Sequence, residues 1–181
     1  MERSGAFGDP GVRVLVAFES RKGSTGEIAE TIAAEIRTAG WDVDVTEIMD
    51  LPRPEEYGYV IIGGPLHMGK IKSVRDFVDM HEAVLQERLV AAFAVGMTFA
   101  SPDEDEQAPA RKILDDAIAP LAVEHLGYFP GKIDMQKLSL IEKAIIKIVK
   151  SPVGDHRDWT GVKSWAQLVS KELKARRLGK S

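Results

Sequence analysis

A short run of hydroxyl, basic and glycine residues separates a strongly apolar segment from an amphipathic one, and its residue types suit phosphate binding. The run consists of Ser20, Arg21, Lys22, Gly23, Ser24 and Thr25. At a strand-to-helix junction, backbone N–H groups and the positive end of the helix dipole stabilise an anion. The three hydroxyls, the glycine and the two basic side chains favour a terminal monophosphate. Alternatively, Ser24 only caps the helix, since serine is a preferred N-cap residue.

Two common nucleotide-binding motifs are missing from the places where they would function. No GxxxxGK[ST] sequence joins a predicted strand to a helix, and no GxGxxG sequence follows the first predicted strand. The pattern therefore disfavours both a P-loop NTPase and an enzyme that binds a dinucleotide.

The elements that must position this run alternate between two periodicities. Apolar or alternating segments predict five strands, at residues 12–18, 42–46, 59–62, 89–97 and 123–129. Apolar positions at helical spacing predict helices within 24–39, 71–85, 108–119 and 159–177. This alternation predicts an α/β fold, a doubly wound five-stranded parallel sheet of order 2-1-3-4-5 with helices on both faces. Ligands of such sheets bind beyond the carboxyl ends of the strands, here at loops 19–25, 63–70 and 97–103.

Several segments carry a resemblance to a known family. The stretch AFESRKGSTGEIAETIAAEI resembles the first strand, loop and helix of the flavodoxins. The succession VIIGGPLHMGKIKSVRDFV, LVAAFAVGM, ARKILDD and, after a long insertion, DWTGVKSW is similar to the flavodoxin-like menaquinone-dependent protoporphyrinogen oxidases. The similarity covers about Val12 to Leu173. It implies the flavodoxin-like fold, an FMN cofactor whose phosphate is held by the 20–25 run, and oxidoreductase activity.

The same resemblance points to two loops that would hold the flavin ring. The first is expected to contribute Pro65, Leu66, His67, Met68 and Gly69, with Gly63 and Gly64 letting the backbone approach the ring. The second is expected to contribute Thr98 and Phe99. The first loop lacks the Trp or Tyr that flavodoxins often stack on the ring, so His67, Met68 or Phe99 must substitute. For Phe99, an ordinary core position at the end of its strand is the alternative.

Composition excludes several kinds of chemistry and of location. The absence of cysteine excludes disulfides, thiolate metal sites and a catalytic thiol, so redox chemistry requires a bound cofactor, and no metal site is predicted. Residues 1–11 are expected to be a flexible lead without the pattern of a secretory signal, and no segment is apolar enough to span a bilayer. We therefore expect a cytoplasmic protein. The acidic run at 103–106 is interpreted as a solvated loop and helix N-terminus.

An insertion at 130–158 interrupts the single domain predicted over 12–177. Its apolar positions recur at helical spacing and lysines occupy the other side, which predicts a basic amphipathic helix within 137–150. Such a helix suits peripheral contact with an anionic membrane at the inner face of the cell membrane. Packing on its own domain or in a homodimer is the alternative. Residues 130–181 hold 12 Lys/Arg against 5 Asp/Glu, yet the net charge of -4 disfavours nucleic-acid binding.

Three functions are consistent with these observations. The first is an FMN-dependent oxidoreductase that passes electrons from a reduced substrate such as protoporphyrinogen IX to a quinone or another acceptor, with no residue assigned as a catalytic acid or base. The second is a flavodoxin-type electron carrier between protein partners. The third is a non-redox module of the same fold. A receiver-like variant of that module is disfavoured, since Gly63 and Gly64 end the strand on which a phospho-acceptor Asp is required.

Overall fold

A five-stranded parallel sheet forms the centre of the computed structural model, which describes residues 13–20 and 23–179. Its strands are β1 (Arg13–Phe18), β2 (Asp42–Glu47), β3 (Tyr59–Pro65), β4 (Leu89–Val95) and β5 (His125–Phe129). They lie in the order β2-β1-β3-β4-β5, and every neighbouring pair is parallel. The predicted α/β fold and strand order are therefore confirmed. Residues 1–12, which include the whole predicted lead, lie outside the described residues.

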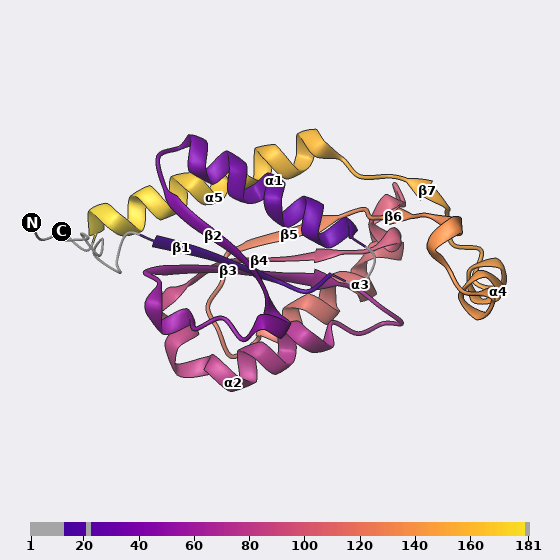
Figure 1. The fold of residues 1–181 in the computed structure, drawn as a ribbon, viewed down its shortest axis with the longest axis horizontal. Helices are drawn as coiled ribbons and strands as arrows, with labels where there is room; N and C mark the ends of the chain where they lie inside the picture. Colours follow the sequence, from indigo (N-terminus) through magenta and orange to yellow (C-terminus); the bar gives the residue numbers. More distant parts are fainter. Residues whose placement is uncertain (1–12, 21–22, 180–181) are drawn as a thin grey trace, which may run out of the picture.

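Helices cover both faces of the sheet (Figure 1). One face carries α1 (Ser24–Thr38) and α5 (Trp159–Gly179), and the other carries α2 (Lys72–Arg88) and α3 (Glu104–Ile118). Three short 3-10 helices, η2 (Ile48–Asp50), η3 (Pro54–Glu56) and η4 (Met97–Ala100), lie in the connections. Helix α3 begins four residues earlier than its apolar spacing predicts, because Asp103 caps it and accepts a bond from the Asp105 N–H at 2.9 Å.

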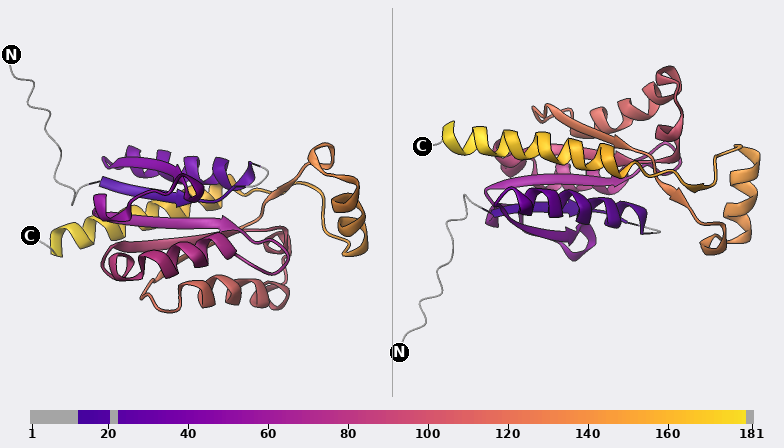
Figure 2. Two further views of the ribbon diagram at one scale, coloured as in Figure 1. Left: turned by 60° about the horizontal axis from the view of Figure 1, so that its bottom comes forward. Right: turned by 90° about the horizontal axis from the view of Figure 1, so that it is seen from above.

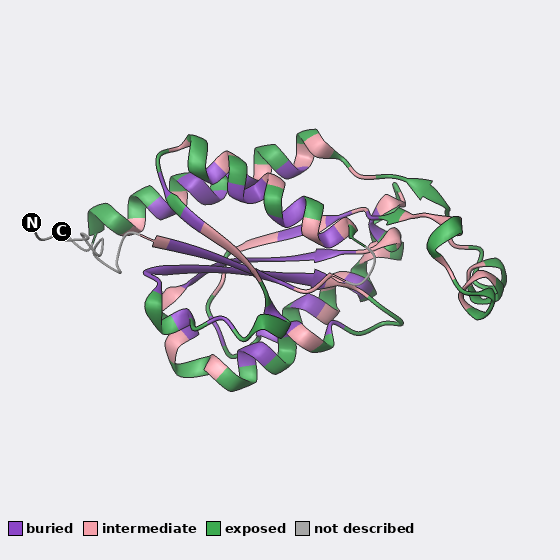
Figure 3. Cartoon of the chain, in the orientation of Figure 1, coloured by how far each residue is buried: buried purple, intermediate pink, exposed green. Residues whose placement is uncertain are grey.

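The sheet separates two apolar cores because successive strand side chains point to opposite faces. In β1, Val14, Val16 and Phe18 pack under α1 and α5, whereas Leu15 and Ala17 pack under α2 and α3. All seven residues of β4 are buried, as their continuous apolar sequence predicts for a central parallel strand (Figure 3).

The insertion projects from the carboxyl edge of the sheet as a separate arm (Figure 2). It contains β6 (Lys132–Ile133), η5 (Met135–Lys137), α4 (Leu140–Ile148) and β7 (Gly154–Asp155). Strands β6 and β7 pair antiparallel and bring the two ends of the arm together. The sequence pattern predicted the helix but not this pair of two-residue strands, because strands this short have no detectable periodicity.

Candidate functional site

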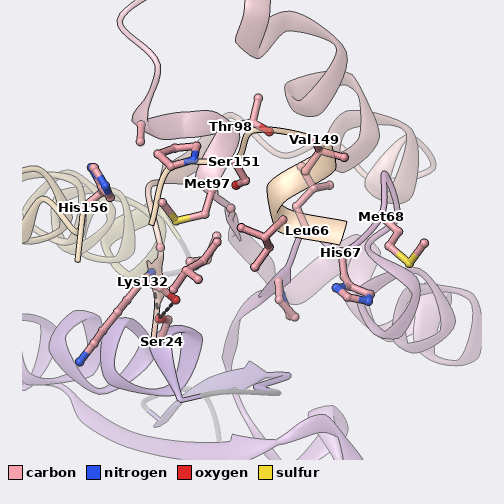
Figure 4. A pocket seen from close by; sticks show the side chains of 18 of the residues that line it. Ser24, Leu66, His67, Met68, Met97, Thr98, Lys132, Val149, Ser151 and His156 are labelled. Carbon is pink, nitrogen blue, oxygen red and sulfur yellow. Dashed lines mark hydrogen bonds between the residues drawn. The ribbon is translucent and has the colours of Figure 1, made fainter. Parts of the chain in front are cut away.

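A cavity of about 1180 Å³ lies beyond the carboxyl ends of the strands, where the topology predicts a ligand. Four segments surround it: the start of α1, the loop after β3, the loop after β4, and the arm. Figure 4 shows Ser24 and Lys132 at one end of the cavity and His67 and Met68 at the other, with Leu66 between them. The topology thus brings together residues that are more than a hundred positions apart in the chain.

The start of α1 forms the end of the cavity suited to a phosphate. Gly23 precedes the helix in the left-handed region, with φ 96°, which only glycine adopts without strain. Its N–H donates to Ser20 Oγ at 3.1 Å, and Thr25 is buried in the first turn. Because Gly23 has no side chain, no side-chain cap satisfies the first-turn N–H groups of α1. Arg21 and Lys22 lie outside the described residues.

The Ser24 hydroxyl already contacts the arm. Ser24 Oγ accepts a hydrogen bond from the Lys132 N–H at 3.1 Å and lies 3.4 Å from the Lys132 carbonyl oxygen. The serine therefore joins the arm to the first turn of α1, a role that the sequence pattern did not suggest. Its hydroxyl remains on the cavity wall (Figure 4).

The loop after β3 is a tight turn that forms one wall of the cavity. Backbone bonds of 2.9 and 3.0 Å join His67 and Lys70, and the Leu66 N–H donates to Val95 O at 2.8 Å. Met68 and Gly69, with φ 47° and 69°, make the turn between them. Pro65, Leu66, His67, Met68 and Gly69 all line the cavity. Leu66 is partly buried in this turn, whereas His67 and Met68 are exposed.

Gly63 and Gly64 serve the core rather than the cavity. A Cβ on Gly63 would lie 2.3 Å from the ring of Phe93, and one on Gly64 would lie 3.0 Å from Val74. Both positions are within buried β3, and neither lines the cavity. The expectation that they bring backbone close to a ring is therefore corrected: they make room for large neighbours on each face of the sheet.

The loop after β4 contributes a second wall through Met97 and Thr98. Phe99 is only 6% exposed and packs on Tyr128 with ring centroids 5.5 Å apart. It is absent from the cavity lining, so the structure places it behind the wall, in the core below α2 and α3.

The arm supplies the remaining wall, which the sequence prediction did not include. Ile145, Ile146 and Val149 of α4 and its C-terminal end line the cavity, as do Ser151 and His156 further along. The apolar residues of α4 fall into two stripes, one facing the cavity and one facing outward. In the sequence the two stripes could not be told apart, and they were interpreted as a single apolar arc. Of the second stripe, Leu140, Ile141 and Ile148 are 75–83% exposed.

Charged groups are concentrated at the base of the arm. Arg157 hydrogen-bonds to Asp155 and holds the pKa of that carboxyl down to about 2. The same guanidinium pairs with Glu27 in the first turn of α1. Elsewhere, burial and a hydrogen bond to Asp44 raise the pKa of Tyr57 to about 12. The arm is thus joined to the phosphate end by ionic contacts, whereas apolar contacts line the centre of the cavity.

Comparison with known proteins places this arrangement in a family. The sequence model of the flavodoxin domain matches residues 15–160. The chain belongs to the flavodoxin domain family. Flavodoxin domain proteins of known structure share its fold. A flavodoxin from the domain Archaea superposes with a TM-score of 0.57 at 16% identity, covering 90% of this chain and 99% of that one. Oxidised flavodoxin 1 of Bacillus cereus gives 0.56 at 20% identity, covering 90% and 97%.

A curated relative of this flavodoxin domain protein has a named activity. Protoporphyrinogen IX dehydrogenase [quinone] of Escherichia coli K12 is 23% identical over 174 residues, which cover 88% of this chain and 95% of the relative. The family and this relative indicate a flavin-based redox role for the chain.

The cavity fits the flavin that the family implies. One end has first-turn N–H groups without a side-chain cap, beside a glycine in a conformation that excludes other residues. The middle is apolar, bounded by Leu66 and Met97. A helix N-terminus without a side-chain cap, joined to a cavity with apolar walls, suits a ligand with a phosphate at one end and an aromatic ring at the other.

Proposed function

We propose that this protein is an FMN-dependent oxidoreductase that passes electrons from a reduced substrate, such as a porphyrinogen, to a quinone. The observation that carries the proposal is the single cavity that joins the phosphate end to two ring-binding loops and to the apolar side of α4. Its volume of about 1180 Å³ exceeds the roughly 300–1,000 Å³ typical of pockets for one small molecule. The space therefore suits a cofactor together with a second small molecule.

In this proposal each wall has a defined task. Ser20, Gly23 and the first turn of α1 bind the phosphate, with Arg21 and Lys22 adding positive charge. Leu66 and Met97 hold the ring between apolar surfaces, and the 65–69 turn fixes its edge. When bound, a flavin supplies the acceptor for the two electrons that leave the reduced substrate. The apolar wall formed by α4 limits access of water to the flavin and the reduced substrate.

The named relative and the cavity support this choice of donor and acceptor. The Escherichia coli relative carries the name of a protoporphyrinogen IX dehydrogenase that uses a quinone. A quinone ring and the pyrrole rings of a porphyrinogen are largely apolar, which suits the wall made by Ile145, Ile146 and Val149. Each pair of electrons would leave with two protons and reduce one quinone to one quinol.

The first experiment measures cofactor binding and turnover together. FMN is titrated into the purified protein while fluorescence and thermal unfolding are recorded, and oxidation of protoporphyrinogen IX is then followed anaerobically with a menaquinone analogue. We expect quenching of FMN fluorescence, a raised Tm, and porphyrin formation that requires both FMN and the quinone. Unchanged FMN fluorescence together with an unchanged Tm would contradict the proposal.

A flavodoxin-type electron carrier is the alternative that the solved neighbours favour. It predicts FMN binding and a stable one-electron reduced form, without porphyrin formation in the presence of quinone. A substitution of Ile146, in the cavity wall formed by α4, distinguishes the enzyme from the carrier. In an enzyme, Ile146→Asp should lower turnover with porphyrinogen and leave FMN affinity within about threefold, because the substitution alters only the arm side of the cavity.

We also propose that the arm contacts an anionic membrane surface, as expected for a protein at the inner face of the cell membrane. The outward stripe of α4 presents Leu140, Ile141 and Ile148 beside Lys143 and Lys147, an arrangement that suits the headgroup boundary. In residues 13–20 and 23–179, no helix has the length and apolar character required to cross a bilayer.

Vesicle sedimentation tests this contact. Ile141→Asp should reduce binding to vesicles that contain phosphatidylglycerol, and Lys147→Glu should reduce it further at low salt. Met80→Asp is the matched control, because Met80 is also an exposed apolar residue but lies on α2. Concentration-dependent dimerisation that Ile141→Asp abolishes, without vesicle binding by the wild type, would instead assign the stripe to a homodimer.

A further inference from the structure

Arg157 is an almost buried cation between the arm and helix α1. Its side chain is 6% exposed and makes three directed contacts. Nε and Nη2 donate to the two carboxylate oxygens of Asp155 at 2.8 and 2.6 Å, and Nη1 donates to Glu27 Oε2 at 2.6 Å. The guanidinium carbon lies 4.6 Å from the ring centroid of Trp159. The contacts fix the position of the cation on every side.

The partner carboxylate, Glu27, lies at the end of the cavity where the phosphate is proposed to bind. It lies in the first turn of α1 and lines the cavity at its phosphate end. Its Oε1 is 3.9 Å from the point at which a Cβ on Gly23 would stand. A carboxylate there interacts well with the helix dipole, but it repels any anion bound at the same N-terminus.

Among the described residues, the four charged groups linked by these interactions sum to zero only when Arg157 is present. Glu27 and Asp155 carry the negative charges, and Arg157 and Lys132 carry the positive ones, since Lys132 also acts on Asp155. Removing the guanidinium leaves the Glu27 carboxylate beside the phosphate end without this ion-pair partner. That carboxylate would also lose the bond that holds it toward the arm.

We infer that Arg157 is a positioning residue that neutralises and orients Glu27 so that a phosphate monoester dianion can bind at the N-terminus of α1. The inference rests on the proposed function, because FMN supplies such a phosphate. It makes the arm part of the cofactor site, through a cation contributed by the segment that follows β7.

A structural role for Arg157 predicts different behaviour from the role in charge compensation. If the residue only anchors the arm, any change that breaks the cluster should weaken every ligand of the cavity alike. If it compensates Glu27, the effect should depend on the charge left behind and on the phosphate of the ligand. Riboflavin, which has the ring but lacks the phosphate, separates the two effects.

The test titrates FMN and riboflavin into the wild type, R157Q, E27Q, the double variant E27Q/R157Q, and D155N, with the Tm of each protein recorded. We expect R157Q to weaken FMN about tenfold or more and riboflavin less than about twofold, because only FMN meets the uncompensated carboxylate. E27Q/R157Q should recover FMN affinity to within about threefold of the wild type. D155N is the matched control: it breaks the same cluster but removes a negative charge, so FMN affinity should stay equal or rise.

Two results would overturn the inference while leaving the cofactor assignment intact. One is an equal loss of FMN and riboflavin affinity in R157Q. The other is a double variant that binds FMN as weakly as R157Q does. If the wild type binds neither FMN nor riboflavin, the proposed function fails, and the inference fails with it.

Discussion

The sheet domain and the arm use apolar residues in opposite ways. In β4 every residue is buried, and its large side chains meet partners on both faces of the sheet. In α4, six of nine residues are Leu, Ile or Ala, yet none is buried. Apolar character alone therefore does not identify a core. In the arm it marks surfaces that face a cavity on one side and the exterior on the other.

The largest expected effect sharpens this contrast in stability. Phe93 in β4 is fully buried and packs near Phe129 and Trp165, with ring centroids 6.2 and 6.1 Å away. Phe93→Ala should lower the free energy of unfolding by about 3–5 kcal/mol. Ile148→Ala in α4, the control, should change it by no more than about 0.5 kcal/mol. Urea unfolding monitored by circular dichroism measures both, and similar losses would refute the contrast.

A second prediction concerns whether the arm opens independently of the sheet. Ser139 and Glu142 form a capping box at the start of α4, with reciprocal bonds of 3.2 and 2.8 Å. Ser139→Ala should destabilise the helix locally by about 1 kcal/mol. Hydrogen exchange should then accelerate several-fold at α4 amides, while the β4 amides in the same sample serve as the internal control. Equal acceleration in both elements would mean that the arm and sheet unfold together.

A third prediction uses a polar atom inside the sheet domain. Ser170 of α5 is 5% exposed, and its Oγ has no hydrogen-bond partner among the described residues. Removing an unpaired buried hydroxyl should be neutral or stabilising, so Ser170→Ala should raise the free energy of unfolding by about 1 kcal/mol or less. Thermal unfolding measures the change, with Ser164→Ala, nearer the start of the same helix, as the comparison variant. A lower Tm would show that the hydroxyl is paired.

The smallest expected effect is the response of the arm to acid. Arg157 holds the pKa of Asp155 at about 2, below its ordinary 3.8. A depressed pKa contributes stability that is fully present above about pH 4 and is lost as the pH falls through about 2. The wild type and D155N should therefore differ in arm protection above pH 4 and converge near pH 2. Hydrogen exchange of the arm at several pH values tests this, and a constant difference would contradict it.

The sheet was predictable because each of its signals is local and repeated. Continuous apolar runs gave β1 and β4, and helical spacing gave α1 and α5, so their order implied the topology. The 65–69 turn followed from its place after β3. In contrast, the sequence offered both a core position and ring contact for Phe99, and the packing on Tyr128 that accompanies its burial lies outside any local pattern. The link from Ser24 to Lys132 and the pair of Glu27 with Arg157 join distant segments, so no pattern within one segment indicates them.

The pairing of β6 with β7 has a consequence for how such a protein can be altered. Because Ile133 faces Gly154 and the His156 N–H donates to Gly131 O at 3.2 Å, the arm leaves and re-enters the sheet domain at almost one point. This pairing holds the two ends of the arm together, whatever the length of chain between them. We expect that an arm shortened to a turn would leave the path of β5 into α5 unchanged.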